Sequence, residues 1–207
     1  LTNEDVDRLR TGKQVDFKVM TIEALFDVDD ADPDRSLRRA IDQMVSAAVS
    51  AIQSGASLLI ISDRGISEKR VPIPSLLAIA AMHHGLLDRG LRGEVGLVIE
   101  TGEPREVMHF CLLCGFGANA INPYLAFGAI QELYRRGEFP PGTDPAQLND
   151  NYITAVKKGM LKTISKMGIS TLRSYHAAQL FEAIGLERSV MDAYFKGTAS
   201  RIGGVGL

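Results

Sequence analysis

The sequence predicts an α/β fold in which parallel βαβ units form a layered or partial-barrel body, followed by a mostly helical C-terminal extension. Two short, almost entirely apolar runs, at 57–62 and 95–99, are typical of strands that are covered on both faces. Helical patterns separate such runs at roughly 30–35 residues per unit, the length of a parallel βαβ unit with a right-handed crossover. The 207 residues suffice for one domain with a real core.

The first region, 1–35, is acidic and is expected to be a leading segment with little structure before its end. An extended apolar piece runs over 15–22. At 32–34 the sequence Asp-Pro-Asp supplies an N-cap, a proline at the first helical position and an acid that suits the helix dipole. Apolar residues then recur at helical spacing until Gly55, which predicts a helix that ends there.

The second region carries the βαβ pattern. Prolines open its helices and glycines close them, because proline suits the first helical turn and glycine suits the residue after the last one. The runs SLLIIS and VGLVI are the clearest strands, and a weaker third strand follows. We expect strands at 57–62, 95–99 and 118–121, and helices at 75–88, 104–114 and 124–136.

Residues 138–150 are expected to be a linker, because they contain Pro-Pro-Gly and Asp-Pro in a polar stretch. This linker divides an α/β segment, 1–137, from a helical, glycine-ended segment, 151–207. Asn151 is expected to cap the first helix of the second segment. The glycines in 197–206 are expected to form tight turns, or to let the backbone approach another part of a larger protein. The expected helices are 152–164, 175–184 and 187–194.

Composition narrows the classes of partner and compartment. The net charge of −2 and the pI of about 6.1 argue against nucleic acid or an anionic membrane as a partner. No run approaches the ~20 apolar residues that a spanning helix needs. Two cysteines indicate a reducing compartment, and we expect the cytoplasm. The chain begins at Leu1 and its first residues are too polar for a signal peptide, so we expect a processed chain or a fragment of something larger.

The cysteines and histidines do not predict a metal site. Cys111 and Cys114 form a C-x-x-C, but a structural zinc site needs four ligands and no second pair follows. The two thiols fall near the end of an expected helix, where the dipole does not favour a thiolate, so we expect buried core thiols. His83 and His84 are adjacent, so on a helix their side chains diverge by about 100° and cannot share a metal.

Polar residues follow each of the three expected strands. In parallel α/β sheets, ligands bind outside the carboxyl ends of the strands, so these residues are candidates for a polar rim that binds a small molecule. The alternative is that they cap helices and satisfy each other as arginine–carboxylate pairs. The rim residues are Asp63, Arg64, Glu100, Thr101, Asn122 and Tyr124.

Four strings occur in an order that resembles one family. They are IISDRGISEKRVPIP at 60–74, HFCLLCGFGANAINPYLAF at 109–127, NYITAVKKGMLKTISKMGISTLRSYHAAQLFEAIG at 151–185 and GTASRIGG at 197–204. Together they resemble the large, synthase-type subunit of glutamate synthase, from the latter part of its central domain into the start of its FMN-binding region. The resemblance covers essentially the whole chain. One string alone is weakly specific, and the ordered set is highly specific.

The resemblance implies a reaction and its cofactors. The family forms L-glutamate from glutamine and 2-oxoglutarate: an amidotransferase domain releases ammonia, which passes through a tunnel to a β/α barrel that carries FMN and a 3Fe–4S cluster. Reduced FMN delivers a hydride to 2-iminoglutarate. Electrons come from NADPH through a small subunit, or from ferredoxin. The implied partners are the other domains of the subunit and one of these donors, with neither nucleic acid nor a membrane.

The resemblance also implies that this segment is not itself catalytic. The family's cysteine nucleophile, cluster ligands and principal flavin-binding segment match no position of this sequence, so we assign no catalytic residue, metal ligand or bound cofactor. We expect a scaffold for the two active sites and the ammonia tunnel. An independent module that binds a small anion and a non-catalytic interaction domain are the alternatives. Candidates for facing the flavin domain, at what is otherwise a helix stop, are Ser165, Lys166, Met167, Gly168 and Ser170.

Overall fold

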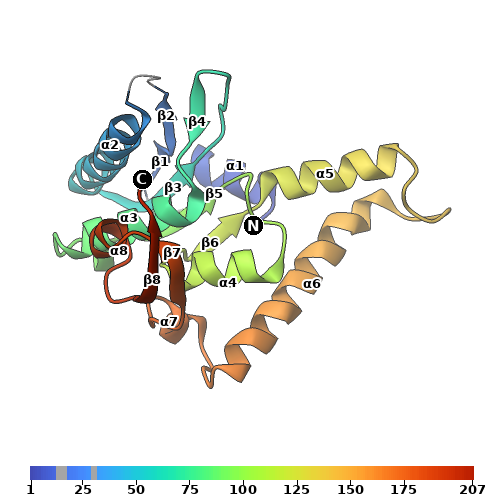
Figure 1. The fold of residues 1–207 in the computed structure, drawn as a ribbon. Coiled ribbons are helices and arrows are strands. Elements are labelled where there is room, and N and C mark those ends of the chain that lie inside the picture. The colour runs from blue at the N-terminus through green and yellow to red at the C-terminus, as the bar shows by residue number, and fades with distance from the viewer. Residues whose placement is uncertain (13–17, 29–31) are drawn as a thin grey trace.

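The structure, a computed structural model, describes residues 1–12, 18–28 and 32–207. Its centre is a four-stranded parallel sheet with the strand order β1-β3-β5-β6 (Figure 1). The α/β class predicted from the sequence is confirmed, and the three predicted strands lie close to their expected positions. The strands are β1 (Lys18–Glu23), β3 (Ala56–Ser62), β5 (Gly96–Glu100) and β6 (Ala120–Asn122).

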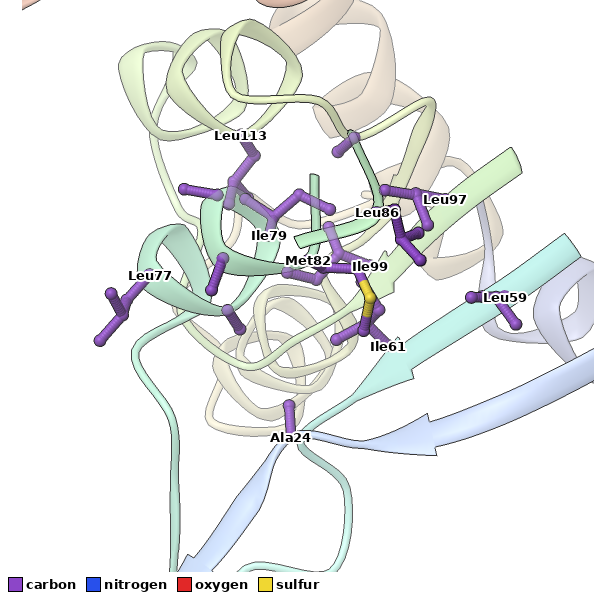
Figure 2. Close-up of a cluster of buried hydrophobic side chains, with 14 of the residues drawn as sticks. Ala24, Leu59, Ile61, Leu77, Ile79, Met82, Leu86, Leu97, Ile99 and Leu113 are labelled. Carbon is purple, nitrogen blue, oxygen red and sulfur yellow. The ribbon is translucent and has the colours of Figure 1, made fainter. Parts of the chain in front are cut away.

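One face of the sheet carries the main hydrophobic core. Successive side chains of a strand point to opposite faces, so Ile61 of β3 and Ile99 of β5 share this face and pack against the helices (Figure 2). Asp32 caps the first of these helices, as its sequence predicts. The covering helices are α2 (Pro33–Gln53), α3 (Ser75–Leu87) and α4 (Val107–Gly115).

A helix that the sequence analysis missed, α1 (Asn3–Thr11), packs on the opposite face. Val6 of α1 is fully buried in a small cluster with Ile60 of β3 and Val98 of β5. Both faces of these strands are therefore covered, which explains their almost continuous apolar sequences.

The expectation of a leading segment with little structure was wrong. Thr2 and Asp5 form a capping box that starts α1, and β1 pairs in parallel with β3 along its whole length. Of the extended piece expected at 15–22, the part 18–22 belongs to β1, and 15–17 lie outside the described residues.

Shorter elements complete the body. β2 (Leu25–Asp27) pairs antiparallel with β4 (Arg70–Pro72), apart from the main sheet. A short 3-10 helix, η1 (Arg92–Glu94), precedes β5, and α5 (Tyr124–Arg135) follows β6. The predicted helices at 75–88, 104–114 and 124–136 are confirmed as α3, α4 and α5, with ends that differ by at most three residues.

The linker expected at 138–150 is shorter than predicted. Helix α6 (Pro145–Lys166) begins within it, and the Asp144 carboxylate accepts a hydrogen bond from the Ala146 amide. Asp-Pro is thus an N-cap with proline at N1 rather than a turn, and Asn151 lies inside the helix instead of capping it. In Figure 1, α5 and α6 project from the body as a helical hairpin. Division of the chain at this point stays a prediction.

The longest helices do not resemble membrane spans. α2 and α6 have 21 and 22 residues, yet both carry polar and charged side chains along their length. In the three described stretches, no helix is both long and apolar enough to cross a membrane.

The C-terminal extension is mostly helical, as predicted, but it also contains an unpredicted pair of strands. Its elements are α6, α7 (Leu172–Tyr175), β7 (Glu182–Leu186), α8 (Arg188–Tyr194) and β8 (Ala199–Val205). The helix expected at 175–184 was wrong, because Ala177 and Gln179 both have positive φ values and the chain then enters β7. The helix expected at 187–194 is confirmed as α8. Of the glycines expected to form turns, Gly197 lies in a turn, whereas Gly203 and Gly204 lie in β8.

Candidate functional site

The six predicted rim residues lie together at the carboxyl ends of β3, β5 and β6. Asp63 and Arg64 directly follow β3, Glu100 ends β5, and Asn122 ends β6. The backbone amide of Asp63 donates a hydrogen bond to the backbone carbonyl of Glu100 over 3.1 Å, which links the end of β3 to the end of β5. The parallel register brings these positions to one edge, because Ser62 lies opposite Glu100 and Glu100 lies opposite Asn122.

The Glu100 carboxylate is the centre of the rim. Its side chain is fully buried, and it accepts hydrogen bonds from Ser62 Oγ over 2.5 Å and from Arg64 Nε over 2.6 Å. Arg10 of α1 also donates to it. Burial by itself would raise the pKa of Glu100, but the hydrogen bonds from Ser62, Arg10 and Arg64 outweigh burial and lower it. The carboxylate therefore stays charged and holds α1 against the sheet edge.

Asp63 organises the neighbouring loop. Its carboxylate accepts a hydrogen bond from Thr101 Oγ1 over 2.6 Å and one from the Gly102 amide over 3.0 Å. The Arg64 guanidinium lies 4.2 Å from the centre of the Tyr124 ring, a cation–π contact. Burial raises the pKa of Tyr124, and Asp63 adds to the effect, so this phenol stays protonated.

Asn122 connects the rim to the start of the chain. Its Nδ2 donates to the Leu1 carbonyl and to Asn3 Oδ1, each over 3.1 Å. Arg64 Nη2 also donates to Asn3 Oδ1, over 3.2 Å. Asn3 and Arg10 thus belong to the rim, and sequence reasoning missed both because α1 was not recognised. The available signal was the T-x-x-D pattern of the capping box at Thr2.

The rim is chemically an ion-pair network around a buried carboxylate, with both guanidinium groups partly exposed. Two guanidinium groups, of Arg10 and Arg64, share one carboxylate, and the second group also stacks on an aromatic ring. The Arg64 guanidinium is already engaged by Glu100, Asn3 and the Tyr124 ring, which disfavours capture of a small anion by this residue. This geometry matches the mutual pairing that was the alternative interpretation of the rim. A small-molecule ligand at this edge stays a prediction.

The second candidate set, at 165–170, lies far along α6 and apart from the rim. It forms the end of the helix: Gly168 has a φ of +75°, its amide donates to the Ser165 carbonyl over 3.0 Å, and the Ile169 amide donates to the Ile164 carbonyl over 3.2 Å. This is a glycine C-cap. Lys166 and Met167 are exposed beside it. The proposed role of this set, facing a flavin domain, stays a prediction.

The cysteines are buried core thiols, as predicted. Cys111 and Cys114 are both free, and burial raises the pKa of Cys114 to about 12. Tyr175 Oη donates to the Cys111 carbonyl over 3.1 Å, which ties the extension to α4. Within the described parts of the chain, no three His, Cys, Asp or Glu side chains are grouped as a metal site would require.

Three histidines gather where the extension meets α3. His83 Nδ1 accepts a hydrogen bond from Arg92 Nε over 3.1 Å. Burial, with repulsion from Arg92, His84 and His176, lowers the pKa of His83 to about 4. Burial likewise lowers the pKa of His84 and of His176. At neutral pH His83 is therefore an uncharged acceptor that positions Arg92.

Two cavities lie beside the sheet, and none of the six rim residues lines either of them. A cleft of about 560 Å³ lies between β1, β2 and α2, and its polar lining includes Glu23, Arg39 and Arg70. An apolar cavity of about 230 Å³ lies beside the edge strand β6, where α4, α5 and α6 meet. Phe127 and Tyr152 are among its lining residues.

Known proteins match the chain over almost its full length. The family described as "Glutamate synthase central domain" matches residues 1–187. The glutamate synthase (NADPH) large chain of Bacillus subtilis is 43% identical over 207 residues, which are 100% of this chain and 13% of that protein. Glutamate synthase (NADH) of Schizosaccharomyces pombe is 41% identical over 99% of this chain and 10% of that protein. Ferredoxin-dependent glutamate synthase 2 of Synechocystis sp. is 38% identical over 99% of this chain and 14% of that protein. The chain therefore spans between 10% and 14% of the length of these relatives.

Solved structures show a likeness in fold. A flavocytochrome b2 variant with sulfite bound matches with a TM-score of 0.55 at 13% identity, over 86% of this chain and 38% of that one. A second variant, with pyruvate bound, matches with a TM-score of 0.55 at 12% identity, over 99% of this chain and 47% of that one. At such low identity the likeness concerns the fold alone, and it agrees with the partial-barrel architecture expected from the βαβ pattern.

Proposed function

The chain belongs to the glutamate synthase central-domain family, and from this premise we propose that it works as a segment of a glutamate synthase. The observation that carries the proposal is the family match over residues 1–187, together with 38–43% identity to glutamate synthases across at least 99% of the chain. The complete enzyme would form L-glutamate from 2-oxoglutarate and the amide nitrogen of glutamine, with reduced FMN as the hydride donor.

The partners would be the other domains of the same polypeptide and a source of electrons. The relatives include NADPH, NADH and ferredoxin-dependent forms, so the donor would be a nicotinamide-oxidising subunit or ferredoxin. The reducing compartment expected from the two thiols supports a cytoplasmic location.

The residues of this chain do not fit either cofactor of the family. A 3Fe–4S cluster would need a third thiolate, while the sequence has two cysteines, both buried in the core. For FMN, the candidate residues 165–170 form an exposed helix end with a glycine C-cap, and none of them lines the two cavities beside the sheet. We therefore derive no chemical step through FMN or the cluster on this segment.

The role that suits this segment is to hold two active sites at a fixed separation. A scaffold must resist deformation, and this body has a continuous core under a sheet that is covered on both faces. The buried Glu100 carboxylate, paired with Arg10 and Arg64, joins α1 to the sheet edge. The apolar pocket beside β6 is open to the surface, and covered by another domain it would form part of the wall of an ammonia path.

Two purified proteins test the proposal: the 207-residue chain and the complete polypeptide that carries it. We expect stoichiometric flavin absorbance and glutamate formation from glutamine and 2-oxoglutarate in the complete polypeptide, and neither in the 207-residue chain. Stoichiometric flavin on the short chain would contradict the placement of the cofactor. A complete polypeptide that forms no glutamate with a nicotinamide or ferredoxin donor would contradict the proposed function.

A further inference from the structure

A small pocket lies where the last part of the C-terminal extension packs beside α3 and the end of α4 (Figure 1). Its volume is about 110 Å³, which is room for several water molecules or for one small ion. Two imidazoles of α3 and three polar side chains of the extension line it, and each of the five carries an N–H or O–H donor. They are His83, His84, Gln179, Lys196 and Thr198.

His83 is an enclosed donor of this pocket. Its side chain is buried, with 8% exposed, and its Nδ1 accepts a hydrogen bond from Arg92 Nε over 3.1 Å. The proton of the neutral ring therefore sits on Nε2, and this N–H is the donor that His83 can offer to a ligand. Beside it, His176 Nε2 is buried without a hydrogen-bond partner among the described residues. Buried polar atoms are almost always paired, so an unpaired one calls for a group that the chain itself does not supply.

The surroundings of the pocket are positively charged. Arg92 donates four hydrogen bonds, all of them to uncharged acceptors, so its charge is not neutralised by these contacts. Burial, and next to it repulsion from Arg92, lowers the pKa of His83 and of His176. Burial, and next to it repulsion from Lys196, lowers the pKa of His84. An anion would relieve this repulsion, whereas another cation would add to it.

Lys196 keeps donors for a ligand although it already has one partner. Its Nζ lies 2.5 Å from the Asp88 carboxylate, and the two side chains are 44% and 52% exposed. Such an exposed pair contributes little to stability, because water screens it. An ammonium group also has three N–H donors, of which Asp88 takes one.

The wall of the pocket is held in a strained and closely packed conformation. Ala177 and Gln179 both line it and have φ values of 55° and 53°, in the left-handed region that residues other than glycine rarely adopt. A Cβ on Gly197 would overlap the Gln179 amide, and a Cβ on Gly117 would overlap the His83 ring. These contacts fix the Gln179 and His83 donors in place, as a preformed binding site requires.

We propose that this pocket binds a small oxyanion of the phosphate type, with His83 Nε2, Lys196 Nζ and the Thr198 hydroxyl among its donors. A phosphate group has more acceptor oxygens than a carboxylate, which matches a pocket with five donor side chains. The ligand joins the extension to α3, because its donors come from both. The site goes beyond the proposed function of the segment and does not depend on it.

Equilibrium dialysis of radiolabelled inorganic phosphate against the complete polypeptide tests the site, with the 207-residue chain measured in parallel at the same ionic strength. We expect saturable binding of one equivalent that depends on Lys196 in both proteins. A complete polypeptide without saturable binding would overturn the proposal, even if the short chain binds phosphate, because the pocket would then be a contact with another domain.

Substitutions assign the bound phosphate to this pocket. Lys196→Met should weaken binding by about tenfold or more, because a hydrogen bond from a charged donor is lost. Thr198→Val removes one donor at almost unchanged shape and should also weaken binding. Lys158→Met, at an exposed lysine of α6, is the matched control and should leave binding unchanged. If neither Lys196→Met nor Thr198→Val weakens binding relative to this control, the site is wrong.

Methyl phosphate distinguishes two sources of the phosphate group. Binding at least as tight as that of inorganic phosphate would assign the site to a phosphomonoester, and much weaker binding would assign it to free phosphate. The readout does not use glutamate formation. A polypeptide that binds phosphate in this pocket but forms no glutamate would therefore contradict the proposed function and keep the site.

Discussion

Glu100 at the end of β5 accepts a hydrogen bond from Arg64 after β3, with Oε1 and Nε 2.6 Å apart. The carboxylate is fully buried and Arg10 reaches it from α1, so one acid joins two strands and the helix that covers them. A buried charge is tolerated only with such pairing, because its desolvation is otherwise too costly. The strand ends of this sheet are thus tied together by charge, at the edge where related folds bind ligands.

Replacing Glu100 with glutamine should destabilise the fold by about 1–3 kcal/mol, because hydrogen bonds to a charged group contribute this much. Arg10 and Arg64 would lose their counter-charge but keep partial access to water, which limits the loss. Urea denaturation of the purified chain measures the change in the free energy of unfolding.

Glu132 provides the matched control. It also pairs with two arginines, Arg135 and Arg136, but on the exposed surface of α5. Glu132→Gln should change the free energy of unfolding by only about 0.5 kcal/mol or less, because exposed pairs are screened by water. Equal effects of the two substitutions would show that burial of Glu100 adds nothing.

The free energy of unfolding should decrease as pH is lowered, because acid forces His83 to take up a proton in the folded state. Its folded-state pKa of about 4 lies below the ordinary value of 6.5, so its contribution is complete above 6.5 and is lost as pH falls toward 4. Between pH 4 and 6.5 the unfolded state therefore binds more protons than the folded state. The slope of the free energy of unfolding against pH is therefore positive, up to about 1.4 kcal/mol per pH unit for one proton.

His83→Gln keeps an acceptor for Arg92 but cannot titrate. Between pH 4 and 6.5, we expect this variant to reduce the slope of the free energy of unfolding against pH by up to the contribution of one proton. The slope that is left would come from His84 and His176, whose pKa values are also lowered. Urea denaturation across this pH range provides the measurement. An unchanged slope would mean that His83 is not the group whose protonation costs stability.

Two helical glycines should respond to alanine in opposite directions. Gly159 of α6 lies against Val107 of α4, and an added Cβ would overlap that branched side chain. Gly159→Ala should therefore destabilise by about 1–3 kcal/mol, as overpacking does. Gly128 of α5 has open space around it, and Gly128→Ala should stabilise by up to about 1 kcal/mol through helix propensity. Thermal unfolding of both variants tests the close α4–α6 packing, and a stabilising Gly159→Ala would refute it.

The body of the fold could be predicted because its signals are local. The runs that became β3 and β5 are almost entirely apolar, and Ser75 to Leu87 has few polar side chains that could lie at a surface. Such residues have few alternatives to burial, so their structure follows from their own sequence. The six rim residues could be predicted because they follow strands that are themselves recognisable from the sequence.

The missed elements depend on contacts between distant residues. α1 is polar except for Val6 and Leu9, and only its packing on β3 and β5 makes it a sheet-covering helix. β7 looked helical from its apolar spacing, but the positive φ of Ala177 and Gln179 breaks that period. β8 is glycine-rich and exposed, so its pairing with β7 leaves no pattern of burial in the sequence.

We propose that this segment holds two active sites of a glutamate synthase in register, so that nitrogen passes between them without release. The most direct measurement supplies the complete polypeptide with glutamine labelled in its amide nitrogen, 2-oxoglutarate, an electron donor and a large excess of unlabelled ammonium. Undiluted label in the amino group of the glutamate formed from 2-oxoglutarate is the predicted result. Label diluted to the level of the free ammonium would contradict the claim.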